Sequence, residues 1–325
     1  MKVIRAEIQR TGGPEAITWR EDELGAPGPG EVTLVHAAVG INFIDTYHRS
    51  GIYPVDLPGS LGLEAAGRIA AVGAGVTGFK EGDRAATLGP ERGAYSSARN
   101  VSAASLFALP DSIDDRTAAA SLLKGGTAEF LIERCAKVQP GWPVLVHAAA
   151  GGVGLLLVQW LKHIGASVIG TVGTPAKAEL ARAAGADHVI LYTSEPVAAK
   201  VRELTGGAGV RVTFDGIGMA TWEASLDATG KRGLVVSYGN ADAPVAGVAL
   251  GLLGTKGSLF VTRPTLFNYY ADPAERAAGA RRVWDMIESG KLKVTVGQSW
   301  PLTQAAAAHR ALEARETTGS SLLIP

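Results

Sequence analysis

The residues with the clearest chemical potential form a glycine-rich turn, Ala149–Gly154, between an apolar run and an amphipathic segment. Ala149, Gly151 and Gly154 fill the three positions of the G-x-G-x-x-G pattern, with alanine in place of the first glycine. The second glycine lets the backbone approach a pyrophosphate, and the third lets the following helix pack closely on the strand. The helix N-terminus offers N–H groups to the anion. The turn therefore favours a dinucleotide site over a plain strand-to-helix connection, in which glycines are also common.

The residues that follow the next expected strand indicate which dinucleotide is bound. An NAD site usually carries an acidic residue about 20 residues beyond the glycine turn, where it holds the ribose 2′-hydroxyl. This chain has Gly173, Thr174 and Lys177 in that region and no carboxylate. A carboxylate would repel the 2′-phosphate of NADP, whereas Lys177 can attract it. The sequence therefore predicts NADPH as cofactor, although Lys177 could also be an ordinary solvated lysine of a helix.

Composition limits the kind of protein and its partners. The chain has 325 residues, 46% of them hydrophobic, and this size favours two domains. Lys+Arg and Asp+Glu both number 31, so the formal net charge is zero and gives no general attraction to nucleic acid or anionic lipid. We expect a small-molecule partner and no membrane or nucleic-acid partner. The single cysteine, Cys135, and the absence of an apolar leader or a long apolar stretch predict a cytoplasmic protein without disulfides.

Two patterns of predicted elements divide the chain. The first third contains short strands separated by glycine- and proline-rich turns, which indicates an antiparallel, β-rich domain. From about Lys124, strands alternate with helices, which indicates a doubly wound parallel sheet with helices on both faces. A helix at 273–289 then precedes a short tail that we expect to pack back on the first domain. The predicted early strands are 3–4, 17–19, 32–39 and 65–72, and the later elements are 144–148, 153–164, 167–172, 176–184, 188–191, 197–204, 210–214, 220–228, 233–237 and 258–261.

Several motifs together resemble the medium-chain dehydrogenase/reductase superfamily, and within it the zinc-independent NADPH:quinone reductases related to zeta-crystallin. The likeness covers essentially the whole chain. It implies an α/β fold, in which a Rossmann domain at 125–263 binds NADP and a β-rich GroES-like catalytic domain comprises 1–124 and 264–325. The motifs are the glycine turn, Asn42-Phe-Ile-Asp45, Tyr47-His-Arg-Ser-Gly-Ile-Tyr53, Gly62-Leu-Glu-Ala-Ala-Gly67, Val261-Thr-Arg-Pro264 and Gly319-Ser-Ser-Leu-Leu-Ile-Pro325.

Zinc chemistry is disfavoured by the residues at the expected ligand positions. Zinc-dependent relatives carry Gly-His-Glu where this chain has Gly62, Leu63 and Glu64, and leucine cannot bind a metal. One cysteine excludes a thiolate-rich zinc site. None of the six histidines shows a spacing typical of a metal site, so we expect packed or surface histidines and no metal.

Without zinc no strong Lewis acid would hold an alkoxide, so quinones suit the site better than alcohols. An electron-poor quinone needs mainly proximity to the nicotinamide and a hydrogen-bond donor. The resemblance implies that Asn42, Tyr47 and Tyr53 line the quinone pocket as catalytic residues. The tyrosines could instead be half-buried packing residues in a loop of the β-rich domain. Transfer of a hydride and transfer of single electrons both remain open.

The resemblance also implies the remaining contacts of the cofactor. Asn42 and Thr127 would lie on the nicotinamide side, and Gly173, Thr174, Lys177, Tyr192 and Arg315 would surround the 2′-phosphate. Simpler roles remain open, since Tyr192 could cap a strand, Ser237 could begin a turn and Arg263 could form a salt bridge. We interpret Asp215 as a turn residue and Cys135 as a small packed side chain. The other implied contacts are Gly151, Gly152, Val153, Gly154, Ser237, Tyr238, Gly239, Asn240, Thr262 and Arg263.

Two other functions compete with quinone reduction. An NADPH-dependent reductase of α,β-unsaturated carbonyls needs a similar site and differs in receiving hydride at a β-carbon. An NADPH-binding protein with a structural or RNA-binding role is disfavoured by the absence of basic and aromatic clusters. The resemblance also suggests a homodimer formed through the predicted edge strand at 258–261, whose apolar residues would otherwise be uncovered.

Overall fold

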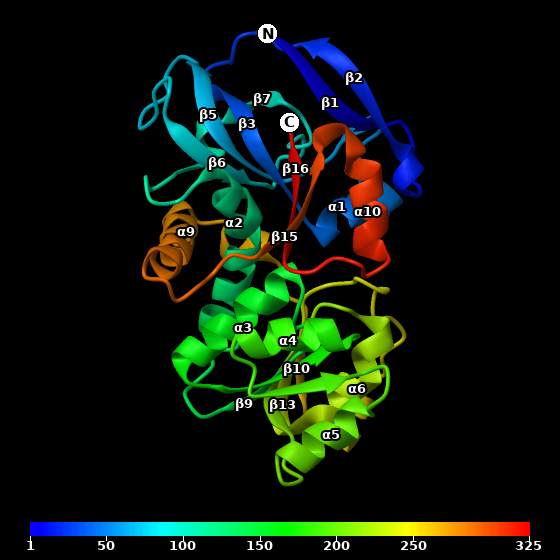
Figure 1. Ribbon diagram of the computed structural model, residues 1–325. Helices are drawn as coiled ribbons and strands as arrows, with labels where there is room; N and C mark the ends of the chain where they lie inside the picture. The colour runs from blue at the N-terminus through cyan, green and yellow to red at the C-terminus, as the bar shows by residue number, and fades with distance from the viewer. The chain divides into compact units, whose positions relative to one another are not determined.

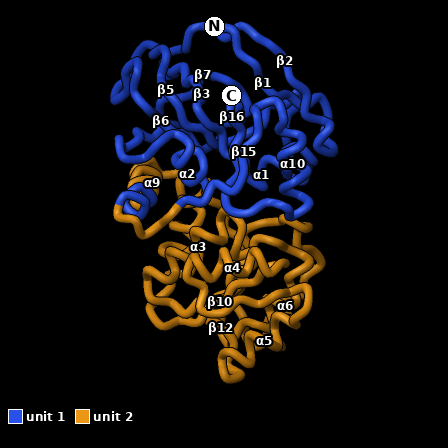
Figure 2. Tube along the Cα trace, viewed as in Figure 1, with its two compact units in different colours: residues 1–124, 283–288, 294–325 blue, residues 125–282, 289–293 orange.

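The computed structural model describes residues 1–325 and consists of two compact units (Figure 2). Unit 1 comprises Met1–Lys124, Val283–Glu288 and Val294–Pro325, and unit 2 comprises Gly125–Arg282 and Ser289–Lys293. Residues 264–282 and 289–293, which the sequence predicted as part of the catalytic domain, belong to unit 2. Compact units need not coincide with functional domains, so the predicted division between catalysis and cofactor binding stays a prediction.

Unit 1 contains a seven-stranded sheet and a three-stranded sheet, shown in blue and cyan with the C-terminal strands in red and orange (Figure 1). The larger sheet has the order β15-β16-β3-β5-β6-β8, with β7 also paired to β3, and the smaller has the order β2-β1-β4. The predicted early strands correspond to β1, β2, β3 and β5, so the β-rich architecture is confirmed. The strands are β1 (Lys2–Ile8), β2 (Ile17–Glu23), β3 (Glu31–Ile41), β4 (Gly59–Ser60), β5 (Glu64–Val72), β6 (Arg84–Leu88), β7 (Ala98–Ser102), β8 (Leu106–Ala108), β15 (Val296–Pro301) and β16 (Ser320–Ile324).

The C-terminal tail completes unit 1, as the sequence predicted. Strand β16 pairs antiparallel with β3, with Leu322 opposite Gly40, and β15 pairs parallel with β16. Leu323 joins the buried cluster that contains Val39 and Ile41 of β3. The helix α10 (Ala305–Glu313) adds Ala305 to the same cluster. Removing the tail would therefore uncover the apolar face of β3.

Unit 2 is the doubly wound sheet that the alternating pattern predicted. All five strand pairs are parallel, and the order is β11-β10-β9-β12-β13-β14. The strand order reverses beside β9, and ligands of such sheets bind at the carboxyl ends of the strands near this point. The elements are β9 (Pro143–Val146), α3 (Gly152–Ile164), β10 (Ser167–Val172), α4 (Pro175–Ala183), β11 (His188–Leu191), α5 (Val197–Leu204), β12 (Val210–Asp215), α6 (Trp222–Ala228), β13 (Thr229–Ser237) and β14 (Phe260–Thr262).

The two faces of the sheet are distinguished by the alternation of side chains along each strand. On one face Leu145 and Ile169 pack with Val201 of α5. On the other face, Gly170 lies against Ala149. A Cβ on Gly170 would come within 2.8 Å of the Ala149 Cβ. The helices α3 and α4 lie together, apart from α5 and α6 (Figure 1).

Several helices have weak sequence signals and were not predicted. They are α1 (Phe43–Ser50), α2 (Asp115–Glu129), a π-helical turn (Phe130–Cys135), α7 (Gly251–Thr255) and α8 (Leu266–Tyr269). The predicted helix at 273–289 is α9 (Pro273–Glu288). Cys135 lies in the π-helical turn and is partly buried, in line with its interpretation as a small packed side chain. No helix of the structure combines the length and apolar character needed to cross a membrane.

Candidate functional site

The glycine-rich turn of unit 2 leaves the N-terminus of α3 available to a ligand. Gly151 is the N-cap and supplies no side-chain cap, so the first N–H groups of α3 lack intrahelical acceptors. A Cβ on Gly154 would come within 2.2 Å of the Ala148 carbonyl oxygen, so glycine is needed for α3 to begin this close to the strand. No acidic residue occupies the first turn of α3. These features fit a pyrophosphate group, which is anionic and accepts hydrogen bonds from N–H groups.

A second group of predicted contacts lies at the carboxyl ends of β10 and β11. A Cβ on Gly173 would lie 2.6 Å from the hydroxyl oxygen of Tyr192, so these two residues are neighbours. Thr174 is the N-cap of α4, and its hydroxyl oxygen accepts the N–H of Lys177 at 3.3 Å. The first turn of α4 has no acidic residue. A lysine, a phenol and a helix N-terminus without a carboxylate suit a phosphate better than a ribose hydroxyl pair.

A third group lies at the carboxyl ends of β12, β13 and β14. A Cβ on Gly216 would lie 2.8 Å from the ring of Tyr238, and a Cβ on Gly239 would lie 2.4 Å from the Gly216 carbonyl oxygen. The Arg263 guanidinium donates to the carbonyl oxygen of Ser237 at 2.9 Å. Small residues therefore let the turns after β12 and β13 approach closely, and Arg263 ties the segment after β14 to them.

In unit 1, the three residues predicted to contact the substrate lie on and beside α1. Asn42 is the N-cap of α1, Tyr47 lies within the helix, and both are 5% exposed. The rings of Tyr47 and Tyr53 are 5.2 Å apart in an edge-on arrangement, and the Tyr53 N–H donates to the Tyr47 carbonyl oxygen at 3.1 Å. The suggestion that Tyr47 belongs to a loop is wrong. The signal that could have found α1 is Asn42 followed three residues later by Asp45, an arrangement similar to a capping box.

Glu64 fixes the orientation of Asn42 and was not identified as a site residue from the sequence. Its carboxylate is fully buried and accepts the Leu123 N–H at 2.7 Å, the Asn42 amide N–H at 2.9 Å and the Lys124 ammonium at 3.3 Å. One N–H of the Asn42 amide is therefore committed to Glu64. A glutamate within the apolar run Leu61–Ala66 is the available signal, because a buried carboxylate needs specific partners.

Asp45 is a second buried carboxyl beside Asn42. Its Oδ2 accepts the Asn42 backbone N–H at 2.8 Å and the Tyr95 hydroxyl at 3.1 Å, while its Oδ1 has no partner. Burial raises the pKa of Asp45 to about 7, although these hydrogen bonds and the Lys124 charge oppose the shift. Asp45 thus joins the start of α1 to the core of unit 1.

The chain of polar contacts continues from Tyr95 to the C-terminal helix α10. His309 Nε2 lies 2.8 Å from the Tyr95 hydroxyl oxygen, and His309 Nδ1 lies 3.4 Å from the Arg49 guanidinium. Burial and the Arg49 charge lower the pKa of His309 to about 3, so the ring is neutral at pH 7. Arg49 also forms two hydrogen bonds with the Glu313 carboxylate, at 3.0 and 2.5 Å. The helix that carries Asn42 and Tyr47 is thereby anchored to α10.

Comparisons with known proteins identify the family. Residues 28–140 match the family model described as the alcohol dehydrogenase GroES-like domain, and residues 152–269 match that described as zinc-binding dehydrogenase. The chain is 48% identical to a quinone oxidoreductase of Pseudomonas aeruginosa over 322 residues, covering 99% of both chains. It belongs to the quinone oxidoreductase family of the medium-chain dehydrogenase/reductase superfamily.

Two further relatives bear on the chemistry of this quinone oxidoreductase family member. The crystal structure of the Escherichia coli quinone oxidoreductase complexed with NADPH is 47% identical, with a TM-score of 0.97 and coverage of 99% of this chain and 100% of that one. A 2-haloacrylate reductase of a Burkholderia species is 44% identical over 334 residues, covering 99% of both chains. The open N-terminus of α3 fits the NADPH that the sequence predicted.

Two residues at the zinc positions of the superfamily, Leu63 and Asn42, offer no metal ligand in this quinone oxidoreductase family member, since Leu63 is apolar and Asn42 donates to Glu64. Leu63 is 1% exposed within the core, and the structure places no group of three or more His, Cys, Asp or Glu residues where they could hold a metal ion. Four of the six histidines are buried and two are exposed, as expected for packed and surface histidines. Zinc independence stays a prediction, supported by the chemistry of Leu63.

The remaining predicted residues of this family member fall at several places. Thr127 lies in α2 and is partly buried, Thr262 ends β14, and Arg315 is exposed just after α10. Asn42 and Arg315 belong to unit 1, and the other predicted cofactor contacts belong to unit 2. Asp215 accepts the N–H groups of Ile217 and Gly218 at 2.8 and 3.2 Å, which confirms it as a turn residue.

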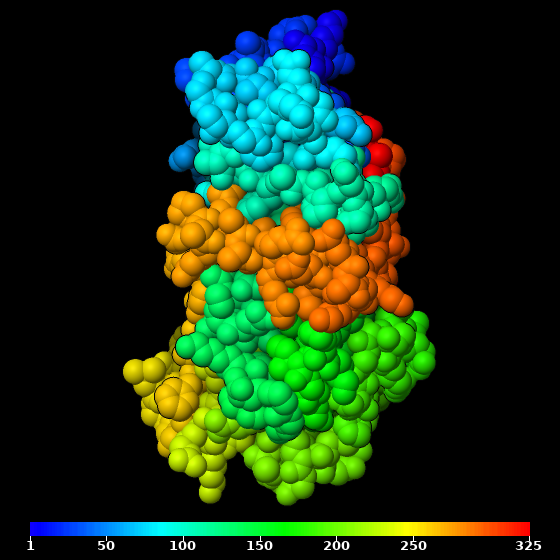
Figure 3. All heavy atoms as spheres, turned by 90° about the vertical axis from the view of Figure 1, so that its left-hand side faces the viewer, coloured from blue at the N-terminus to red at the C-terminus, as the bar shows by residue number.

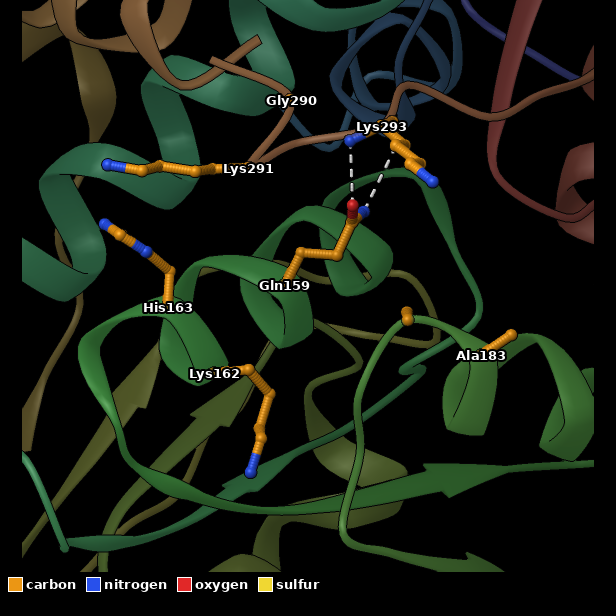
Figure 4. A pocket seen from close by; sticks show the side chains of 8 residues that line it. Gln159, Lys162, His163, Ala183, Gly290, Lys291 and Lys293 are labelled. Carbon is orange, nitrogen blue, oxygen red and sulfur yellow. Dashed lines mark hydrogen bonds between the residues drawn. The ribbon is translucent and has the colours of Figure 1, made fainter.

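A shallow surface pocket of about 380 Å³ in unit 2 contains none of the predicted site residues (Figure 4). Gln159 forms hydrogen bonds with the backbone N–H and carbonyl of Lys293 there, at 2.8 and 3.1 Å. The side chains of Lys162, Lys291 and Lys293 extend in different directions (Figure 4). The pocket therefore lacks the convergent polar groups that ligand sites present.

Proposed function

We propose that this protein reduces small quinones with electrons from NADPH, without zinc. The observation that carries the proposal is the close approach of Gly173 and Tyr192 at the ends of β10 and β11, followed by the first turn of α4 with Lys177, in a chain similar over its whole length to quinone oxidoreductases. The E. coli relative complexed with NADPH supports the choice of cofactor.

The cofactor contacts are proposed residue by residue. Bound NADPH supplies the reducing equivalents, and the chain positions it through backbone N–H groups at α3 and polar side chains at the strand ends. Lys177 balances the charge of the 2′-phosphate, which no neighbouring carboxylate opposes in the first turn of α4. The proposed contacts are Asn42, Thr127, Gly151, Gly152, Val153, Gly154, Gly173, Thr174, Lys177, Tyr192, Ser237, Tyr238, Gly239, Asn240, Thr262, Arg263 and Arg315.

The substrate contacts are proposed on α1 and the segment that follows it. Tyr47 and Tyr53 offer two aromatic rings for a flat quinone, and their hydroxyl groups can donate to developing negative charge on oxygen. Asn42 would donate through its second amide N–H, because the first is held by Glu64. Glu64 and Asp45 then act as positioning residues for Asn42.

The test is NADPH oxidation by simple quinones in the presence of a chelator, with NADH as the comparison. We expect activity with several quinones and a clear preference for NADPH. Lys177→Ala should raise the KM for NADPH about tenfold, the effect of losing about 1.4 kcal/mol of binding, and leave the KM for NADH unchanged. Lys200→Ala is the matched control, because Lys200 pairs with Glu203 on α5. Absence of activity with every quinone would overturn the proposal.

A second candidate function is reduction of α,β-unsaturated carbonyl compounds. The observation that favours it is the 44% identity to a 2-haloacrylate reductase over nearly the whole chain. This reaction adds hydride to the β-carbon and requires a proton at the α-carbon. A panel of quinones, enones, alkenals and 2-haloacrylates under equal conditions distinguishes the two. A kcat/KM for an activated alkene above that for all quinones would favour the second function.

We further propose that two copies of the chain pair through β14. This strand ends the sheet of unit 2, and Phe260 on it is 63% exposed. Nearby in sequence, Leu250 is 80% exposed, and the yellow segment around it projects from the surface (Figure 3). Pairing of a second copy would cover the strand edge and these apolar side chains. Sedimentation should detect a dimer that Phe260→Glu converts to a monomer, and a monomeric wild type would contradict this proposal.

The cytoplasmic location also remains a proposal. It is tested by following the protein during fractionation of the cells that produce it.

A further inference from the structure

A buried chain of four polar side chains crosses unit 2 at the carboxyl ends of β9, β10 and β12. Thr171, His147, Ser225 and Asp215 are between 0% and 2% exposed. His147 Nδ1 lies 3.0 Å from the Thr171 hydroxyl oxygen, and His147 Nε2 lies 3.1 Å from the Ser225 hydroxyl oxygen. The Ser225 hydroxyl donates to Asp215 Oδ2 at 2.6 Å. None of the four was predicted to contact the cofactor.

The direction of each hydrogen bond follows from the carboxylate at one end. Asp215 only accepts, so Ser225 spends its single proton on it and must accept from His147 Nε2–H. His147 Nδ1 then accepts the hydroxyl proton of Thr171. Burial lowers the pKa of His147, against the opposing effect of the Asp215 charge, and the neutral ring with its proton on Nε2 agrees with this order. All the dipoles of the chain therefore point toward Asp215, which strengthens each bond.

Side-chain alternation explains why these residues meet. His147 follows Leu145 by two positions and Thr171 follows Ile169 by two, so both lie on the sheet face that packs against α5. Ser225 lies on α6, the neighbouring helix. These four hydrogen-bonded side chains thus take the place of apolar packing at the carboxyl end of the sheet, where ligands of such sheets bind.

One end of this hydrogen-bonded series holds the glycine turn, which is proposed to contact NADPH. His147 directly precedes Ala148, which has the left-handed φ of +51° that side chains disfavour, and the Ala149 N–H donates to the Thr171 carbonyl oxygen at 3.0 Å. The glycine turn is therefore fixed by both the side chain and the backbone of Thr171.

At the other end, Asp215 holds the turn after β12. It accepts the N–H groups of Ile217 and Gly218 and the Thr221 hydroxyl. The Tyr238 N–H donates to the Asp215 carbonyl oxygen at 2.8 Å, which links this turn to Tyr238, one of the proposed cofactor contacts.

We propose that Thr171, His147 and Ser225 are positioning residues for NADPH, which fix the glycine turn and the turn after β12 in one mutual arrangement. The inference rests on the proposed binding of NADPH, and it assigns a role to residues that do not touch the cofactor themselves. Ser225 is the central link, because its loss removes the side-chain connection between His147 and Asp215 and leaves only the backbone bond from the His147 N–H to the Phe214 carbonyl oxygen, at 3.0 Å. The cofactor then has to order the two turns on binding, which reduces affinity without removing any contact.

The test compares NADPH affinity with thermal stability in three variants. Ser225→Ala removes both side-chain hydrogen bonds of Ser225, and Thr171→Val removes only the one between Thr171 and His147, so Thr171→Val is the milder change. Thr213→Val is the matched control, since Thr213 donates to the Thr229 hydroxyl at 2.8 Å in the same core without contacting either turn. The dissociation constant is measured by NADPH fluorescence, and Tm is measured without cofactor.

We expect all three variants to lower Tm, and Ser225→Ala and Thr171→Val to raise the dissociation constant on the order of tenfold. Thr213→Val should bind NADPH within about twofold of wild type. Unchanged NADPH affinity in Ser225→Ala and Thr171→Val, or an equal loss of affinity in Thr213→Val, would overturn the positioning role. Failure of the wild type to bind NADPH would instead overturn the proposed function, so the two results are distinguishable.

Discussion

The buried pair of Glu64 and Lys124 provides a sharp test of how the substrate side of the site is held. Glu64→Gln keeps the shape of the side chain and removes its charge. The new amide must present an N–H group to at least one of three donors, which are the Leu123 N–H, the Asn42 amide and the Lys124 ammonium. The 5% exposed Lys124 side chain also loses its counter-charge.

The expected cost follows from the burial of both partners. Removing one member of a buried ion pair leaves the other uncompensated and lowers the free energy of unfolding by about 3–5 kcal/mol. This is a large part of the roughly 5–15 kcal/mol that separates most folded domains from the unfolded state. Glu203→Gln is the control, since the exposed pair of Glu203 and Lys200 should contribute less than about 1 kcal/mol.

A double-mutant cycle separates the charge from the orientation of Asn42. Glu64→Gln combined with Lys124→Met removes both charges, and we expect most of the lost stability to return, because neutral replacement of a buried pair is often tolerated. The kcat/KM for a quinone should stay reduced in the double variant, since Asn42 has lost its carboxylate partner. Urea unfolding and steady-state kinetics measure the two effects. A Glu64→Gln variant with wild-type stability and kinetics would refute this account of Asn42.

Three further outcomes follow from the site. Asp45→Asn removes a carboxyl whose pKa rises from 3.8 to about 7 on folding. As the pH is raised from 4 to 7, the unfolded wild type loses this proton before the folded one, so its free energy of unfolding should fall relative to that of the variant. A difference that stays constant with pH in urea melts would contradict the shift. The full effect of a shift of that size is about 4 kcal/mol. Gly154→Ala places a Cβ 2.2 Å from the Ala148 oxygen and should lower both Tm and NADPH affinity, whereas Gly151→Ala, with its nearest atom at 3.3 Å, should lower affinity alone. Gly173→Asp should weaken NADPH more than NADH in fluorescence titrations, because the added carboxylate repels a 2′-phosphate.

Unit 2 could be predicted in large part because its signals are local. The strands β9 to β14 and the helices α3 to α6 are continuous segments with their own periodicity, and the glycine turn is contained within Ala149–Gly154. The parallel order of the sheet then follows from the alternation of strands and helices. Gly173 and Tyr192 are brought together because successive strands place their carboxyl ends at one edge of the sheet.

Unit 1 could be predicted only in part, because its decisive contacts join distant segments. Asn42 meets Glu64 across 22 residues, Glu64 meets Lys124 across 60, and Tyr95 meets His309 across 214. Asn42, Glu64 and Lys124 resemble surface residues in the sequence pattern, since polar and charged residues are usually exposed. Their burial becomes evident only when the antiparallel sheet and the C-terminal tail are in place.

Polar networks in both units occupy positions where apolar packing would be the simpler solution. Asp45 lies three residues after Asn42, and His147 lies one residue before the left-handed Ala148. An apolar side chain at either position would fill space, but it would not fix the direction of a neighbouring amide or a strained turn. A hydrogen-bonded carboxyl or imidazole does so, because each bond has a preferred length and angle. We therefore expect Glu64 and Ser225 to be the two positions at which substitution separates the orientation of the proposed ligand contacts from core packing most cleanly.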